Sequence, residues 1–441
     1  MSTYSVIPER FRAVAGDKLG FVHMHIMDYQ IHFIAEFDGI LDKDRLAQAM
    51  RLLMDAEPVL GSRFVYHWRA PWWQRAEGLA TEDFFSFVEG VEGVKGDVQA
   101  FIGEQIDSYS APQVKARIVR SGGPNVKDTL CLKFNHVPAD GAAAKEGAYL
   151  LADIYRRLGE DPSWRPRPNI DGSRSARQIS SRLSLADKLK VIRRDFRNFS
   201  KKRGYWKPFP ASGEETPRFV REVIGPERFL TLKDYGKQKG ATINDLLLTA
   251  LYRALYKELG SLPDNDMGIL TTVDLRRYLP EGKAGALCFL SGALHSNIGR
   301  EIGKDFEETL RKVMEDINFQ KTDYLGLGDY PAIAFFMDVL PFSIGFRALM
   351  KILKFAMGLG QYKGGFTNLG IIDEGLFRFD GPEVTDAYIQ VPVFTALDTL
   401  FAMGTTTFKN SITLAAGFLG SKSDQAIVER ILRAVSKELP A

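Results

Sequence analysis

One stretch of seven residues decides the fold predicted for this chain: Asn135-His136-Val137-Pro138-Ala139-Asp140-Gly141. The apolar run at 129–134 comes directly before it and predicts a β-strand. The residues from Gly141 to about Leu158 predict a helix, with Gly159 as its expected end. A histidine and an aspartate four residues apart therefore lie in the connection between a strand and a helix. Such a connection can hold a base at the mouth of a cleft.

The residue types in this connection suit acyl transfer. A neutral imidazole can take a proton from an alcohol or amine as that group attacks a thioester carbonyl, so His136 is the candidate general base. This chemistry needs no metal and no covalent enzyme intermediate. Gly141 allows close approach of the backbone at the start of the helix. Asp140 could either orient the imidazole or pair with a buried cation and fix the loop.

The His-x-x-x-Asp-Gly pattern resembles the motif of the acyltransferase superfamily that contains chloramphenicol acetyltransferases, nonribosomal-peptide condensation domains, alcohol acetyltransferases and plant BAHD enzymes. The segment 365–370 is similar to an Asn-x-Gly segment found late in alcohol acetyltransferase-like members. The strand at 412–418 and the helix at 424–439 are similar to the last two elements of the family. The resemblance spans nearly the whole chain. It implies an α/β fold, a two-domain α/β sandwich like the chloramphenicol acetyltransferase pseudo-dimer, with a central tunnel.

The same resemblance implies roles for individual residues. Members commonly carry an arginine after a strand like the one that ends here in Thr272-Val273-Asp274-Leu275-Arg276. By resemblance, Arg276 pairs with Asp140, and both residues are structural at the site, as is Gly141. His136 is then the catalytic base. The candidates for the channel wall or for donors to the substrate carbonyl are Asn135, Ser296 and Asn368.

The implied activity is transfer of an acyl group to a hydroxyl or amine of a small molecule or lipid. The donor is acyl-CoA or an acyl-phosphopantetheine on a carrier protein, which enters as a co-substrate, and no bound cofactor is expected. Condensation domains usually show two consecutive histidines where this chain has Asn135-His136, and the BAHD Asp-Phe-Gly-Trp-Gly signature is absent. Two alternatives stay open: an amide-forming, condensation-type enzyme with a carrier-bound donor, and a non-catalytic binding protein that keeps the fold.

Bulk composition is that of an ordinary globular protein. A chain of 441 residues favours two domains, and a net charge of +3 gives no case for nucleic acid. Cys131 and Cys288 predict reduced, buried thiols. His23 and His25 lie two apart on a predicted strand without a third ligand, so no metal site is expected. Neither a signal peptide nor an apolar run of about 18–20 residues is visible, which predicts a cytoplasmic protein.

Strands and helices alternate along both halves of the chain. We expect an N-terminal half at 1–170 that carries the motif, a basic crossover segment at 171–210 and a C-terminal half at 211–441. The expected helices are at 43–54 after an Asp42 cap, 97–109, from the Thr242-x-x-Asp245 capping box onward, 306–319, 342–357 and 424–439. The expected strands are a strand-rich segment at 23–37 and runs at 114–119, 129–134, 218–224, 269–273, 290–296, 366–372, 387–393 and 412–418.

Two segments have more than one interpretation. The segment 174–207 holds twelve basic residues and two acids around an apolar seam, as an amphipathic helix does. A solvated face is the commonest meaning of such a pattern, while docking of a carrier protein or of CoA phosphates, or peripheral membrane contact, are the alternatives. The apolar helix at 342–357 is more typical of a core, and the alternative is the wall of an acyl tunnel.

Overall fold

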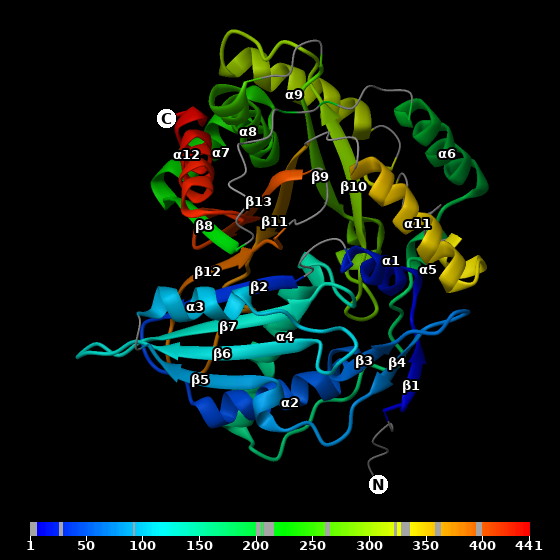
Figure 1. The fold of residues 1–441 in the computed structure, drawn as a ribbon. Helices are drawn as coiled ribbons and strands as arrows, with labels where there is room; N and C mark the ends of the chain where they lie inside the picture. Colours follow the sequence, from blue (N-terminus) through cyan, green and yellow to red (C-terminus); the bar gives the residue numbers. More distant parts are fainter. Residues whose placement is uncertain are drawn as a thin grey trace.

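A computed structural model describes most of the chain. The described residues are 7–25, 30–90, 93–199, 204, 206, 216–260, 265–321, 324–327, 336–357, 363–393 and 399–441. The chain forms a mixed α/β structure with two lobes (Figure 1). Each lobe is built on one large sheet, and the motif turn lies at the end of the strand β7 (Asp128–Asn135) of the first sheet.

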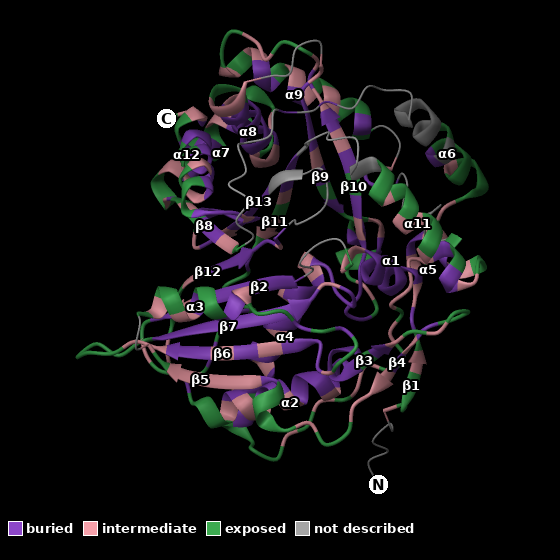
Figure 2. Ribbon diagram, viewed as in Figure 1, coloured by how far each residue is buried: buried purple, intermediate pink, exposed green. Residues whose placement is uncertain are grey.

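Strand β7 is buried along its whole length because helices cover both faces of its sheet (Figure 2). Leu132 and Phe134 face the core cluster beneath α2 (Lys43–Ala56) and α4 (Gly141–Glu160). Cys131 points the other way, into the cluster formed with α3 (Val94–Gly103). Because a strand covered on both faces buries all of its side chains, its sequence is a nearly continuous apolar run. This explains the pattern at 129–134.

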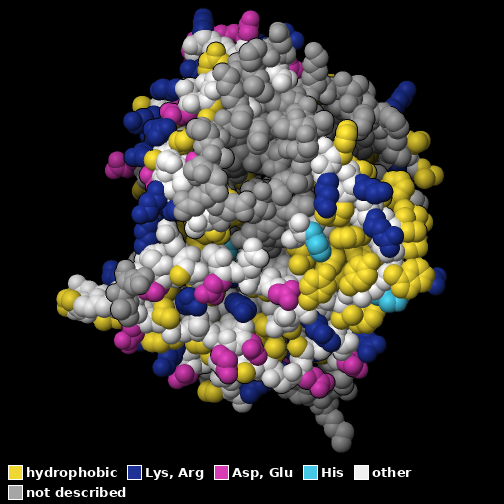
Figure 3. Space-filling model, viewed as in Figure 1, with side chains coloured by type: hydrophobic (Ala, Val, Ile, Leu, Met, Phe, Trp, Pro, Cys, Tyr) yellow, Lys and Arg dark blue, Asp and Glu magenta, His cyan; other side chains and the backbone are white. Residues whose placement is uncertain are grey.

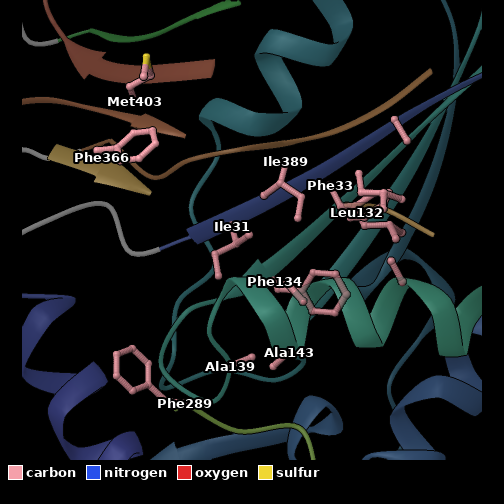
Figure 4. Packing of buried hydrophobic residues seen from close by; sticks show 14 of the residues in the cluster. Ile31, Phe33, Leu132, Phe134, Ala139, Ala143, Phe289, Phe366, Ile389 and Met403 are labelled. Carbon is pink, nitrogen blue, oxygen red and sulfur yellow. The ribbon is translucent and has the colours of Figure 1, made fainter. Parts of the chain in front are cut away.

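The first sheet has five strands in the order β12-β2-β7-β6-β5. The bounds of the other four are β2 (Gln30–Phe37), β5 (Phe85–Glu89), β6 (Val114–Arg120) and β12 (Val384–Gln390). β12 belongs to the C-terminal half of the chain but pairs antiparallel with β2 in the sheet of the N-terminal half. Figure 4 shows buried side chains of the adjacent strands β12, β2 and β7 together: Ile389, Ile31, Phe33, Leu132 and Phe134. The crossing strand ties the two lobes together through backbone hydrogen bonds.

The second sheet has six strands in the order β10-β9-β11-β13-β14-β8. Their bounds are β8 (Pro217–Ile224), β9 (Gly268–Asp274), β10 (Ser291–Asn297), β11 (Lys363–Ile371), β13 (Thr399–Phe408) and β14 (Ser411–Leu419). The accompanying helices are α7 (Pro226–Lys239), α8 (Ile243–Leu259), α9 (Phe306–Lys321) and α12 (Lys422–Glu438). Thr242 and Asp245 form the predicted capping box of α8.

A smaller sheet and several helices complete the structure. The sheet has the order β1-β4-β3, formed by β1 (Arg10–Arg12), β4 (Trp72–Arg75) and β3 (Ser62–Val65). The helices are α1 (Ala15–His23), α5 (Arg177–Ser180), α6 (Leu185–Phe199) and α11 (Phe342–Met357). Among the described residues, no helix is both long and apolar enough to cross a bilayer.

Several local predictions need correction. The helix expected at 97–109 is α3, which begins at Val94 and already ends at Gly103. His23 ends a helix and His25 lies in the following turn, so the strand-rich segment expected at 23–37 begins only at Gln30. Helix α4 does not end at Gly159 but continues to Glu160, and the glycine lets the Arg45 guanidinium approach. Sequence patterns also missed α1 and α7. The division of the chain at 171–210 stays a prediction.

Candidate active site

The motif turn (residues 135–141) is held at its N-terminal end by the carboxamide of Asn135. Its oxygen accepts the Val137 N–H at 3.0 Å, while its nitrogen donates to Ser108 Oγ at 2.6 Å and Gln113 Oε1 at 2.9 Å. The side chain is buried, and both of its N–H groups are engaged. Asn135 therefore supports the turn rather than offering a donor to a substrate carbonyl.

The C-terminal end of the turn is held by Asp140, which is the N-cap of α4. Its carboxylate accepts the Ala143 N–H at 2.9 Å, as an N-cap side chain should. It also accepts Arg276 Nη1 at 2.9 Å and the Leu290 N–H at 2.6 Å. The ion pair expected between Asp140 and Arg276 is thus present, and both side chains are almost fully buried.

The charge on Asp140 is stabilised by these partners. Burial alone would raise the pKa of this carboxyl, but the Arg276 guanidinium and the backbone donors outweigh burial and lower the pKa of Asp140 below its usual value. Arg276 lies in the short helix at Leu275–Tyr278, directly after β9 of the other lobe. The motif turn is therefore fixed across the lobes by a pair that stays charged.

A second arginine supports the middle of the turn. Arg174 donates from Nη2 to the Pro138 carbonyl oxygen at 2.9 Å, and it binds both carboxylate oxygens of Asp17 at 2.6 and 2.9 Å. Asp17 is buried in α1 and also accepts the Trp73 indole N–H at 2.8 Å. The sequence indicates only a basic crossover segment for Arg174, and no sequence pattern points to Asp17.

Both arginines also bind one segment of the C-terminal lobe, residues 287–290, here called the latch segment. The Leu287 carbonyl oxygen accepts Arg174 Nε at 2.9 Å, and the Cys288 carbonyl oxygen accepts Arg276 Nη2 at 2.8 Å. These contacts place the ring of Phe289 with its centroid 5.5 Å from that of His136. The latch segment therefore supplies a wall beside the candidate base.

The His136 imidazole is half-buried at the centre of this arrangement. Burial lowers its pKa from the usual value of 6.5, and the negative charge of Asp140 offsets only part of that effect. The ring is therefore neutral at pH 7 and able to accept a proton. A half-buried, neutral imidazole in a turn that two arginines fix is suited to general-base chemistry.

A second histidine shares the site. Burial lowers the pKa of His23 to about 4, and the nearby His136 adds to the shift. Helix α1, which carries His23, approaches the motif turn closely at Gly20. A Cβ atom there would lie 2.8 Å from the Val137 Cα atom. The close contact needs glycine, and it brings the end of α1 up to the turn. The sequence context of His23 predicts a strand and gives no sign of this position beside the turn.

The remaining predicted site residues lie in different surroundings. Gly141 faces the other lobe, where a Cβ atom would lie 2.3 Å from Leu369 Cδ2. Ser296 is buried and accepts the Tyr252 hydroxyl of α8 at 3.0 Å, so it faces the helical layer of its lobe. Asn368 is exposed on β11, and its side-chain oxygen accepts the Gly370 N–H at 2.9 Å. These hydrogen bonds join Ser296 to α8 and Asn368 to the backbone of its own strand, β11.

The basic segment at 174–207 does not form one helix. Arg177 begins the short helix α5, and α6 begins at Leu185. Lys201, Lys202, Arg203 and Lys207 lie outside the described residues. Both cysteines are free and buried, as predicted. No cluster of three or more His, Cys, Asp and Glu side chains suited to a metal ion occurs in the described ranges.

Solved structures with the same architecture identify the fold. The first condensation domain of the CDA synthetase matches with a TM-score of 0.68 and 16% identity, over 100% of this chain and 98% of that chain. The trichothecene 15-O-acetyltransferase from Fusarium sporotrichioides matches with a TM-score of 0.70 and 13% identity, over 98% and 95%. This is the fold of condensation domains.

A third match carries ligands. A variant of the starter condensation domain of rhizomide synthetase, in complex with C8-CoA and Leu-SNAC, has a TM-score of 0.65 and 11% identity, over 98% of this chain and 95% of that chain. The sequence itself matches no protein-family model and no curated protein. The two-lobed α/β fold expected from the motif is therefore confirmed by three-dimensional similarity alone.

Proposed function

We propose that this protein is an acyltransferase that moves an acyl group from a CoA or carrier-protein thioester to a hydroxyl or amine acceptor. The observation that carries the proposal is the state of His136. Its ring is half-buried with a lowered pKa, in a turn fixed by Asp140–Arg276 and by Arg174. The condensation-domain fold supports the same chemistry, because similar structures include an acetyltransferase and a domain in complex with an acyl-CoA.

In the proposed reaction, His136 accepts the proton of the acceptor as its oxygen or nitrogen attacks the thioester carbonyl. The C–S bond then breaks, the thiolate of CoA or of phosphopantetheine leaves, and the imidazolium returns a proton to it. The reactants would meet in a tunnel between the lobes. The Phe289 ring lies beside the base, with its centroid 5.5 Å from that of His136. His23 stays neutral beside it, because its pKa is about 4.

Formation of an amide from a carrier-bound donor is the second candidate, and the similarity to condensation domains favours it. The basic segment at 174–207 is then the proposed docking site for an acidic carrier protein, and with CoA it would receive the phosphates. Peripheral membrane contact through the same segment stays a prediction. A non-catalytic binding protein with this fold is the remaining alternative.

The test is acyl transfer by purified protein with a panel of acyl-CoA and acyl-pantetheine donors and pooled alcohols or amines. Release of free thiol reports turnover, and mass spectrometry separates esters from amides. His136→Ala should lower turnover by about 100-fold or more, with an unchanged free energy of unfolding. His67→Ala is the matched control, because His67 is also half-buried but lies in the connection between β3 and β4. Equal turnover in wild type and His136→Ala would reject the proposal.

A further inference from the structure

Helix α11 carries a row of exposed apolar side chains that contribute nothing to the core. Ile344, Ile352 and Phe355 are 54%, 63% and 74% exposed, and Ala348 lies between them on the same face. Spacings of four, four and three residues place them along one line of the helix surface. Leaving large apolar side chains in water is unfavourable relative to burial, so such a row indicates a binding surface.

The opposite face of α11 already anchors the helix to the protein. Phe342 is buried, and Phe346 and Leu353 pack against the main core cluster. At the start of the helix, the N–H groups of Phe342 and Ser343 donate to the carbonyl oxygens of residues 69 and 68 at 3.1 and 2.8 Å. The outward row is therefore not needed to hold the helix in place.

The exposed row is part of a wider apolar surface. Trp68, Phe336 and Val339 are more than half exposed next to the start of α11. Figure 3 shows hydrophobic side chains gathered over α1, α5 and α11, with Lys and Arg side chains among them. Exposed apolar patches of this breadth mark binding sites for proteins or membranes.

The charge on α11 distinguishes between these two kinds of partner. The helix contains no Asp or Glu, and its exposed cations Arg347, Lys351 and Lys354 lie beside the apolar row. None of the three forms an ion pair with a carboxylate of the described residues. Asp338, just before the helix, already pairs with Lys18 and Arg177. Cations beside an apolar row, without acids, are the pattern of a helix that lies in the headgroup layer of an anionic membrane.

We propose that α11 is an interfacial helix that holds this protein on an anionic lipid surface. Ile344, Ile352 and Phe355 enter the boundary between headgroups and acyl chains, while the three cations contact lipid phosphates. The surface is one helix away from the candidate site. Phe346 of α11 packs against Phe21 of α1 with ring centroids 5.9 Å apart, and α1 ends at His23. Docking would therefore place the face of the protein that lies beside the candidate site in contact with the bilayer.

Co-sedimentation with vesicles tests this proposal independently of any catalytic activity. The full chain should bind vesicles of phosphatidylcholine with phosphatidylglycerol, and should bind pure phosphatidylcholine at least tenfold more weakly. The double variant Ile352→Glu/Phe355→Glu should abolish binding. The control is Ile40→Glu/Leu376→Glu, which changes two side chains that are also more than half exposed, in the β2–α2 and β11–β12 connections. Control and wild type should bind equally, and circular dichroism should show the same fold in all of them.

A charge-reversal triple variant separates the two parts of the surface. Changing Arg347, Lys351 and Lys354 to Glu should lower partitioning by about 100-fold, from about 1 kcal/mol for each cation. The same triple change at the exposed Lys127, Lys283 and Lys437 gives an equal net charge and should cost far less. Absence of vesicle binding by wild type, or equal loss in both triple variants, would overturn the proposal. So would a dimer in light scattering that Ile352→Glu/Phe355→Glu converts to monomer, because a second copy would then cover the row.

Discussion

Two buried arginine–aspartate pairs hold the motif turn, and they do so from different positions. Asp140 lies in the turn itself and pairs with Arg276, and the exposed fractions of these side chains are 3% and 2%. Asp17 lies behind the turn in α1 and pairs with Arg174, whose side chain is 11% exposed. Each arginine also binds a carbonyl oxygen of the latch segment at 287–290.

The difference lies in what each aspartate does besides pairing. Asp140 also caps α4 and accepts the Leu290 N–H, so removing its charge affects a helix start, a turn and the contact with the latch segment together. The carboxylate of Asp17 also accepts the Val14 N–H at the start of α1 and the Trp73 indole N–H, but it reaches the turn only through Arg174. Stability should therefore depend more on the first pair than on the second.

The largest expected effect is that of Asp140→Asn. The change leaves the buried Arg276 guanidinium without its full counter-charge, and breaking a buried pair from one side costs about 3–5 kcal/mol. Urea denaturation should show this loss as a lower midpoint. Glu429→Gln is the control, because its partner Arg433 is exposed and surface pairs contribute little. Stability equal to wild type in Asp140→Asn would remove the structural role assigned to this pair.

The next effect concerns the N-terminal side of the latch segment, where Glu57 accepts the Leu287 N–H at 3.3 Å and the Asn169 side-chain amide at 2.8 Å. Burial raises the pKa of Glu57 from 4.5 to about 7. Between these two values the folded chain keeps a proton that the unfolded chain has released, so the free energy of unfolding falls as pH rises. The loss attributable to this group is at most about 3 kcal/mol between pH 4 and 8.

Glu57→Gln cannot ionise, so its stability relative to wild type should increase as pH rises from 4.5 to 8. Denaturation of both proteins at each pH gives this difference, and groups that titrate in both of them cancel. Glu374→Gln, at an exposed acid, should run parallel to wild type. A pH-independent difference for Glu57→Gln would show that the pKa of Glu57 is the same in the folded and unfolded chains.

The second pair should respond more weakly. Arg174→Gln removes the ionic partner of Asp17 but leaves the Trp73 indole on that carboxylate, so the expected cost is about 2 kcal/mol, in the range for hydrogen bonds to charged groups. Arg177→Gln is a control from the same segment, because Arg177 is largely exposed. If Arg174→Gln costs more than Asp140→Asn, the order of importance proposed for the two pairs is wrong.

The first pair could be predicted from sequence, and the second could not, for a physical reason. Asp140 and Arg276 lie in two segments that resemble motifs of the acyltransferase superfamily, and the resemblance implied the pair. Asp17 and Arg174 are 157 residues apart, and neither lies in a periodic pattern. A single arginine in a segment rich in basic side chains is predicted to be exposed on the surface. Only the packing of α1 on the turn shows that Arg174 is a partner of the site.

The secondary structure, too, could be predicted only where the sequence carries a recognisable pattern. Strands buried on one or both faces, such as β7 and β8, and helices with capping residues, such as α2 and α8, were predicted within a few residues. Helix α1 was missed because nearly all of its residues are buried, and a helix covered on all sides shows no apolar and polar alternation. The position of His23 at the end of this helix could therefore not be predicted either.

The smallest expected effect tests how closely the lobes approach at the start of α4. Gly141→Ala puts a methyl group 2.3 Å from Leu369 Cδ2, the far end of a flexible side chain, so the neighbour can move and the cost should be about 1 kcal/mol. With Leu369→Ala as the background, the same change should cost nothing, because the contact is gone and alanine suits a helix better than glycine. A double-mutant cycle in urea measures this coupling. An equal cost in both backgrounds would mean that Gly141 is needed for backbone conformation instead, and the contact across the lobes would then play no part in fixing the turn.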